Sequence, residues 1–204
     1  MNSNDTSKKH SSELWIGTRY SGLYLMRFDN DSKLIAREHY SSEEGLPEGV
    51  IHLSHYKENG IENPLILSDS GLFEPVLSIN SKPSGGKNEK QNKEDETKSY
   101  QLQSCTRFGK IFGDGSRQVF RFVQGFREDF WIYDGAQPYH ITKNKTGEMQ
   151  IDSLPFLPMR DKIGEIYAIF PAQGGITWFG GMDGLLSYNI GIAKDYKPQY
   201  HALV

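Results

Sequence analysis

The sequence contains only one cysteine, Cys105, among its 204 residues. An intrachain disulfide is therefore excluded, and so is a metal site built from several thiolates. The chain also lacks any run that approaches the roughly 20 apolar residues of a membrane span, and residues 1–12 lack the apolar stretch of a secretory signal. We therefore expect no direct membrane insertion by this chain; if the parent protein is exported, its signal and anchor lie outside it.

An excess of charge of either sign is also missing, because 23 basic side chains stand against 26 acidic ones and the net charge is −3. Such a balance produces no long-range field that would gather phosphate backbones, so we expect no nucleic-acid partner. The chain is, in contrast, rich in turn and strand formers, with 21 glycines and 12% aromatic residues. This composition favours short strands joined by tight turns and argues against long helices.

One short pattern occurs four times: an apolar strand, a polar turn, then Gly-Leu or its equivalent at the start of another strand. The strands before the turns are Leu14–Thr18, Leu65–Ser68, Phe130–Tyr133 and Ile176–Gly180. The residues that follow the turns are Gly22, Gly71, Gln137 and Gly184, with Gln137 as the exception to glycine. These four positions mark the same point in each copy of an internal repeat, so the repeat length can be measured between them.

The repeat has a period of about 47 residues once one insertion is set aside. The successive spacings are 49, 66 and 47 residues, and the long middle spacing contains 19 polar residues, 81–99, that have no apolar anchor. Such a segment cannot bury enough surface to order itself, and without it the middle spacing is also 47. A period of this length is typical of a four-stranded propeller blade of about 40–50 residues.

Each copy also shows its strand signals in the same order. An alternating strand comes first, such as 166–170 in the fourth copy and Gln118–Val123 in the third, then a turn, then the strand before the Gly-Leu position. Only the first copy lacks this leading strand. We therefore predict an all-β fold: a β-propeller fragment of three to four four-stranded antiparallel blades in an incomplete ring. The predicted divisions are a disordered tail (1–12), two blade repeats (13–80), a disordered insertion (81–99), two further repeats (100–190) and an exit segment (191–204).

The strands Trp15–Thr18 and Trp178–Gly180, each followed by a turn and Gly-Leu, resemble the two-component regulator propeller repeat. The segment Asp195–Val204 is similar to the part through which such propellers lead into a C-terminal β-sandwich-like domain, which is absent here. The resemblance implies a periplasmic sensor domain of a membrane-anchored bacterial receptor. Its implied partners are the remaining blades, the C-terminal domain, and a carbohydrate or other small ligand.

Catalytic and metal-binding motifs find no support in the sequence. His52 and His55 form an H-x-x-H pair, but on a strand residues three apart point to opposite faces and cannot share one ion. The acidic segment 29–31 lacks the glycine and terminal glutamate of a calcium loop, and no nucleophile elbow, phosphate loop or dinucleotide fingerprint occurs. We expect no enzymatic activity, no cofactor and no metal site.

The turns that follow the second strand of each copy contain the candidate ligand-binding residues. In a propeller these turns open on the same end as the segments that lead into the innermost strands, where ligands usually bind. The candidates are Arg19, Tyr20, Asp69, Gln137 and Asp183. The recurrent Trp15, Trp131 and Trp178 are interpreted instead as packing one sheet against the next.

Two other functional classes stay open at this stage. A propeller enzyme of the lyase or glycosidase type would need an acid and a base, and Asp69 and Asp183 are the carboxylates available in the turns. A protein-interaction scaffold would need neither. In every case an incomplete ring leaves sheet faces uncovered, so we expect the isolated chain to form an open arc and to associate, for example as a homodimer.

Overall fold

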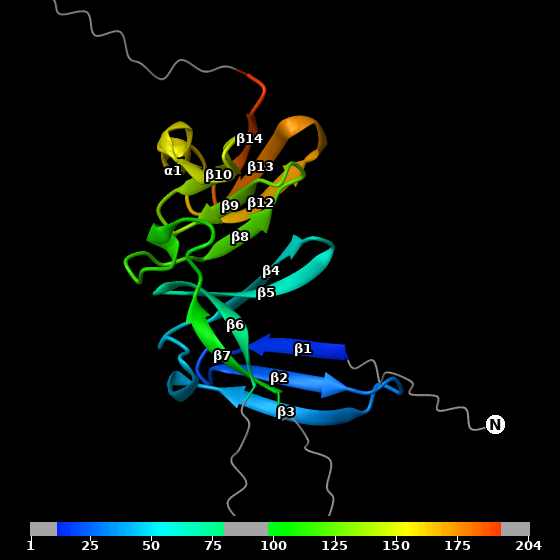
Figure 1. The fold of residues 1–204 in the computed structure, drawn as a ribbon. Coiled ribbons are helices and arrows are strands. Elements are labelled where there is room, and N and C mark those ends of the chain that lie inside the picture. The colour runs from blue at the N-terminus through cyan, green and yellow to red at the C-terminus, as the bar shows by residue number, and fades with distance from the viewer. Residues whose placement is uncertain (1–11, 80–97, 193–204) are drawn as a thin grey trace, which may run out of the picture.

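The computed structural model describes residues 12–79 and 98–192, which fold into four antiparallel sheets (Figure 1). Sheet A contains β1 (Ser12–Gly17), β2 (Leu23–Phe28) and β3 (Leu34–Tyr40). Sheet B contains β4 (His52–Glu58), β5 (Ile61–Ser68), β6 (Gly71–Ile79) and β7 (Lys98–Ser104). Sheet C contains β8 (Arg121–Gln124), β9 (Phe130–Tyr133), β10 (Pro138–Lys143) and β11 (Met149–Asp152). Sheet D contains β12 (Ile166–Ala172), β13 (Ile176–Gly181) and β14 (Gly184–Asn189).

Every sheet is a meander of strands that are consecutive in sequence. The four sheets follow one another along the molecule in chain order, and β1, β4, β8 and β12 contact one another successively along the row (Figure 1). Within the described residues no strand of sheet A pairs with a strand of sheet D. The structure therefore confirms an all-β fold with a repeated four-sheet architecture that does not close on itself.

In residues 12–79 and 98–192, helical structure is confined to short segments in the connections. Four 3₁₀ turns and one five-residue helix, α1, interrupt the loops; α1 lies between sheets C and D and was not expected from the repeat. Their bounds are η1 (Ser42–Glu44), η2 (Lys110–Phe112), η3 (Leu154–Phe156), α1 (Met159–Ile163) and η4 (Gln173–Gly175). Met159 and Ile163 of α1 are buried, so this helix covers part of the apolar edge between the two sheets.

Three separate apolar cores fill the three spaces between the four sheets. Leu23, Leu25, Tyr40 and Ile66 pack between A and B. A larger core between B and C includes Leu65, Leu67, Leu72, Phe108, Phe112, Phe122, Phe130 and Ile132. Between C and D lie Trp131, Tyr133, Phe156, Ile166, Ile169 and Phe179. Among the described residues, sheets B and C are thus covered on both faces, whereas A and D are covered on one face only.

The second strand of each repeat shows how alternation serves two cores at once. Because neighbouring residues of a strand point to opposite faces, one residue faces the preceding sheet and the next faces the following sheet. The residues that face the preceding sheet are Ile66, Ile132 and Phe179, all fully buried. The residues that face the following sheet are Trp15, Leu65 and Trp131, and the same position in sheet D is Trp178.

The predicted strand order agrees with the observed one, with differences at the boundaries. Sheet A has three strands, equivalent to the second to fourth strands of sheet B, as the missing leading strand indicates. Sheet D also has three described strands, so only B and C have the predicted four. Strand β7 begins at Lys98, two residues inside the predicted insertion. The rest of that insertion, the predicted tail before Ser12 and the exit segment after Ile192 lie outside the described residues.

The leading strand of the third copy is shorter than predicted. The sequence indicates a strand from Gln118, but β8 begins at Arg121. The physical reason is that the Val119 N–H donates to the Ser68 carbonyl of sheet B at 2.9 Å and does not join the ladder with β9. This residue therefore links two sheets.

Candidate functional site

The turns between second and third strands gather beside the segments that lead into the first strands. In sheet B, Asp69 lies against Gly49, which precedes β4. In sheet C, Arg117 before β8 forms an ion pair with Asp134 at 2.5 Å. In sheet D, the Asp183 N–H donates to the carbonyl of Ile163, before β12, at 3.0 Å. The same juxtaposition therefore recurs in three sheets and places these turns at one end of each sheet.

Two glycines make this close approach feasible. A Cβ atom at Gly49 would come within 2.6 Å of Asp69 Oδ2, and one at Gly164 would come within 2.6 Å of Asp183 Oδ2. Both glycines have positive φ, +108° and +69°, which disfavours any side chain. The backbone before β4 and β12 is thus shaped to accept the carboxylate of the neighbouring turn.

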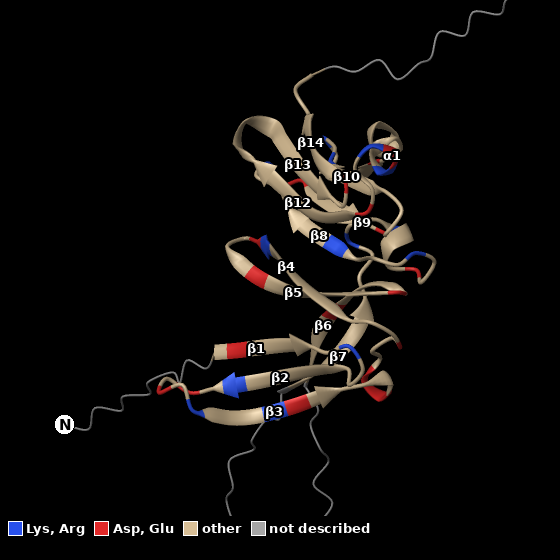
Figure 2. Ribbon diagram, turned by 180° about the vertical axis from the view of Figure 1, so that it is seen from behind, with Lys and Arg blue, Asp and Glu red and all other residues tan. Residues whose placement is uncertain are grey.

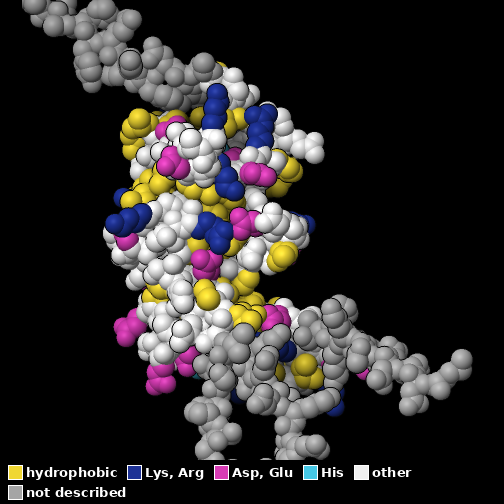
Figure 3. All heavy atoms as spheres, viewed as in Figure 1, with side chains coloured by type: hydrophobic (Ala, Val, Ile, Leu, Met, Phe, Trp, Pro, Cys, Tyr) yellow, Lys and Arg dark blue, Asp and Glu magenta, His cyan; other side chains and the backbone are white. Residues whose placement is uncertain are grey.

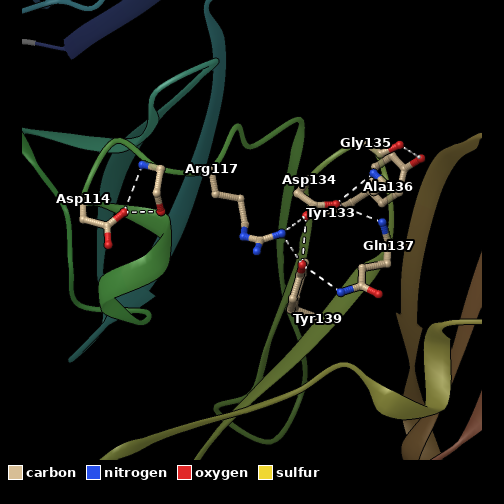
Figure 4. Close-up of polar contacts among 9 residues, drawn as sticks. Asp114, Arg117, Tyr133, Asp134, Gly135, Ala136, Gln137 and Tyr139 are labelled. Atoms are coloured by element: carbon tan, nitrogen blue, oxygen red, sulfur yellow. Dashed lines mark hydrogen bonds and ion pairs between the residues drawn. The ribbon is translucent and has the colours of Figure 1, made fainter.

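The turn of sheet C contains the most extensive polar network of the described residues (Figure 4). The Asp134 carboxylate accepts hydrogen bonds from the Tyr139 hydroxyl at 2.9 Å and from the backbone N–H groups of Ala136 and Gln137 at 2.8 and 2.9 Å. Arg117 also donates to the Tyr139 hydroxyl at 2.6 Å, and its guanidinium lies 5.3 Å from the Tyr139 ring centre. Asp134 is buried, so this network holds a charged group in place inside the fold.

The electrostatics of Asp134 follow from those contacts. Burial by itself would raise the pKa of the carboxyl group, because it disfavours the charged form. The hydrogen bonds from Gln137, Ala136, Arg117 and Tyr139 outweigh burial, and the pKa of Asp134 is lowered. The carboxylate is therefore ionised at neutral pH, and its hydrogen bonds with the backbone of the turn are already formed. It is a structural group and a poor proton donor.

A cavity of about 460 Å³ opens at the end of sheet A, beside the turn between β1 and β2. Thr18 closes this turn through its hydroxyl and its N–H, which both donate to the Gly22 carbonyl at 2.7 and 3.0 Å. Arg19 and Tyr20 are left at the tip, with the Arg19 guanidinium 5.3 Å from the Tyr20 ring centre. Besides apolar residues such as Leu46 and Ile51, the lining contains aromatic, basic, hydroxyl and carboxylate side chains: Arg19, Tyr20, Tyr24, His39, Ser41, Ser42 and Glu48.

The groups at the tip are free to meet a ligand. The Tyr20 side chain is 85% exposed, and within residues 12–79 and 98–192 Arg19 makes no ion pair. His39 helps to hold the turn, because its Nε2 donates to the Ser21 carbonyl at 2.6 Å. A concave site with an exposed aromatic ring, an unpaired guanidinium and nearby hydroxyls can bind a small polar molecule.

A larger cavity, about 590 Å³, lies at the opposite end of sheets B and C. Its guanidinium, Arg107, is already held by Glu58 at 2.7 Å and lies over the Tyr56 ring. Burial is the main cause that raises the pKa of Tyr56, to about 12, so its hydroxyl is neutral at physiological pH. Because Arg107 is used within the fold, we consider the smaller cavity at sheet A the better ligand site.

The five residues singled out in the sequence fall into three places. Arg19 and Tyr20 line the cavity of sheet A, and Asp69 adjoins it through Gly49, which is also part of the lining. Gln137 donates from Nε2 to the Tyr139 hydroxyl at 2.8 Å and belongs to the network of sheet C. Asp183 lies in the turn of sheet D, beside Gly164. The structure thus places Arg19 and Tyr20 at one cavity with Asp69 next to its lining, and separates the other two.

Sequence reasoning missed Arg117, Asp134 and His39. The pair Asp134-Gly135 carries a local signal, because an aspartate before a glycine often hydrogen-bonds the backbone of its own turn. Arg117 and His39 carry no such signal, since their partners lie 17 and 18 residues away and the contacts depend on how the loops fold back.

The described residues show neither a metal-binding cluster nor a reactive thiol. They bring together no group of three His, Cys, Asp or Glu side chains that could hold a metal ion. None of the helices in this part of the chain is long and apolar enough to cross a membrane. Cys105 is buried in the core between B and C, and burial raises the pKa of its thiol to about 12, which keeps it protonated and unreactive at neutral pH.

In comparisons with known proteins, no family model matches the chain, and no curated protein is significantly similar to it in sequence. The site is therefore interpreted from its own geometry.

Proposed function

We propose that this chain is a non-catalytic, ligand-sensing segment of a β-propeller, and that a carbohydrate or similar small polar ligand binds at the cavity of sheet A. The observation that carries the proposal is the position of Arg19 and Tyr20, exposed at the tip of a second-to-third-strand turn and lining a cavity of about 460 Å³. The tyrosine ring offers an apolar face for a sugar ring, and the guanidinium and hydroxyls offer hydrogen bonds to its hydroxyl groups.

The propeller interpretation is supported by the meander topology of each sheet, by the contacts between successive strands of the row and by the three cores between successive sheets. Blades of a propeller pack face to face in this manner. The resemblance of Trp15–Thr18 and Trp178–Gly180 to the two-component regulator propeller repeat supports a sensor in a bacterial signalling receptor, located in the periplasm.

Isothermal titration calorimetry of the chain against a panel of neutral and acidic oligosaccharides tests this proposal. We expect saturable binding that is lost in Tyr20→Ala and weakened in Arg19→Ala. Phe126→Ala is the matched control, because Phe126 is also an exposed aromatic residue but lies in the turn between β8 and β9. No binding by the folded wild-type chain, or equal loss in the control, would contradict the proposal.

A further inference from the structure

The outer faces of the two end sheets both carry apolar side chains, and the face of sheet A also carries Arg37 and His39 of β3, the cross-strand partners of Met26 and Tyr24. On sheet D, β12–β14 contain no Asp, Glu, Lys or Arg, and Figure 2 shows these three strands without charged residues. Phe170 and Trp178 are cross-strand neighbours there, and Leu185 follows on β14. Phe170 and Leu185 are exposed, and hydrophobic side chains are visible around α1 and sheet D in Figure 3. We call Phe170, Trp178 and Leu185 the D face.

Sheet A presents a comparable surface on its opposite side. Because Trp15 faces sheet B, its neighbours Leu14 and Ile16 point away from sheet B. Their cross-strand partners are Met26 and Tyr24, which extend the same face. We call Leu14, Ile16, Tyr24 and Met26 the A face. Monomeric proteins rarely leave contiguous apolar sheet faces uncovered at both ends.

The three internal cores show how the face of one sheet that points to the following sheet packs on the face of that sheet that points back. Between A and B, Trp15 packs against the cluster that contains Ile66. Between B and C, Leu65 and Ile132 belong to one cluster. Between C and D, the rings of Trp131 and Phe179 lie 5.2 Å apart in an edge-to-face arrangement. In each case the forward-facing residue of one second strand meets the backward-facing residue of the next.

Trp178 is the forward-facing residue of the last sheet, and Ile16 is the backward-facing residue of the first. We propose that the D face of one copy of this chain packs on the A face of a second copy, with Trp178 against Ile16, as a fourth instance of the contact that the fold already makes three times. This inference rests on the sheet architecture, and its A face shares one residue, Tyr24, with the cavity of sheet A.

The proposed contact is head-to-tail, because two different faces meet. Such an interface either closes into a ring, here with two copies and eight sheets, or continues into longer assemblies. The three strands of sheet D bring no charged side chain to this contact. The A face brings one, Arg37 of β3, which is exposed and whose long side chain can keep its guanidinium in water at the rim of the contact.

Sedimentation velocity on three variants tests this interface. Leu185→Glu places a charge on the D face and Leu14→Glu places one on the A face; both positions are exposed, so the monomer should keep its fold. We expect the wild type to sediment as two or more copies and each variant alone as one copy. Ile61→Glu is the control: Ile61 is as exposed as Leu185, 66% against 67%, but belongs to sheet B, and this variant should associate like the wild type.

Mixing the two variants makes the test specific. An equimolar mixture of Leu185→Glu and Leu14→Glu retains one intact D face and one intact A face, so a 1:1 pair should form although neither variant associates alone. A wild type that stays monomeric at its highest soluble concentration would overturn the proposal. So would a Leu14→Glu variant that still dimerises, because that result would indicate a symmetric contact between two D faces.

Discussion

Sheets C and D are built from equivalent strands, yet the same repeat position has a different environment in each. Trp131 of sheet C is 1% exposed, stacked on His140 with ring centres 4.2 Å apart and covered by sheet D. Trp178 of sheet D is 39% exposed, because none of the described sheets follows it. The comparison shows that a residue pattern sets which side chains share a face, while the neighbouring sheet decides whether that face becomes a core.

The largest expected contrast concerns these two tryptophans. Trp131→Ala should lower the free energy of unfolding by about 3–5 kcal/mol, because it removes a large side chain from a closed core. Trp178→Ala in the monomer should cost less, about 1–2 kcal/mol, since 39% of that residue is already in water and no closed core is opened. Urea denaturation at a concentration where the chain is monomeric measures both, and equal costs would mean that the D face is covered.

A second contrast compares the aspartates in the turns of the two sheets. Asp134→Ala removes the acceptor of Arg117, Tyr139 and two backbone N–H groups, so we expect a loss of about 1–3 kcal/mol. Asp183 is exposed, and Asp183→Ala should change stability by no more than about 0.5 kcal/mol. The same denaturation experiment applies. A large effect at Asp183 would indicate that its contact with the backbone before β12 also stabilises the fold.

The pH dependence of stability should sharpen this difference. The pKa of Asp134 is lower in the folded chain than the unfolded value of about 3.9, so its stabilisation is fully present above that value. It is lost as the pH falls through the folded pKa, by about 1.4 kcal/mol for each unit of depression. The urea concentration at the unfolding midpoint should therefore fall more between pH 6 and pH 3 for the wild type than for the Asp134→Asn variant. Parallel curves would show that the carboxylate is not stabilised in the native state.

Asp129 also makes the folded chain less stable at low pH, so it contributes to the pH dependence that the experiment measures. Burial by itself would raise its pKa, but the hydrogen bond from His140 Nε2, 2.8 Å from Oδ2, and backbone N–H groups lower it. Asp134→Asn should therefore retain the part of the acid sensitivity that comes from Asp129. Only the difference between the two proteins reports on Asp134.

The smallest expected effect on stability belongs to Tyr20, at the tip of a turn in the other end sheet. Tyr20→Ala should leave the free energy of unfolding within about 0.5 kcal/mol of the wild type, because its ring is in water. Thermal denaturation followed by circular dichroism checks this. If stability is unchanged, a loss of oligosaccharide binding in the same variant reports on a lost contact; a marked drop in melting temperature would show that the ring supports the turn.

The sequence predicted the sheet order better than it predicted the site. The positions Gly22, Gly71, Gln137 and Gly184 identified where each second strand turns into a third. At Gly22 and Gly71 the backbone has positive φ, which favours glycine. The start of β8 and the helix α1 were missed, because Val119 bonds to a neighbouring sheet and α1 packs between two sheets. Neither feature leaves a periodic signal.

What the sequence determined by itself is the two-residue alternation and the 47-residue period, because strand geometry and turn chemistry are local properties. Alternation assigns Trp178 and Phe179 to opposite faces but cannot say which of them meets another sheet. The tertiary structure decided that Phe179 is buried and Trp178 is half-exposed, that Arg117 reaches Asp134, and that Arg19 and Tyr20 line a cavity. These outcomes depend on how the sheets stack and how the loops fold back, which are contacts between segments distant in the chain.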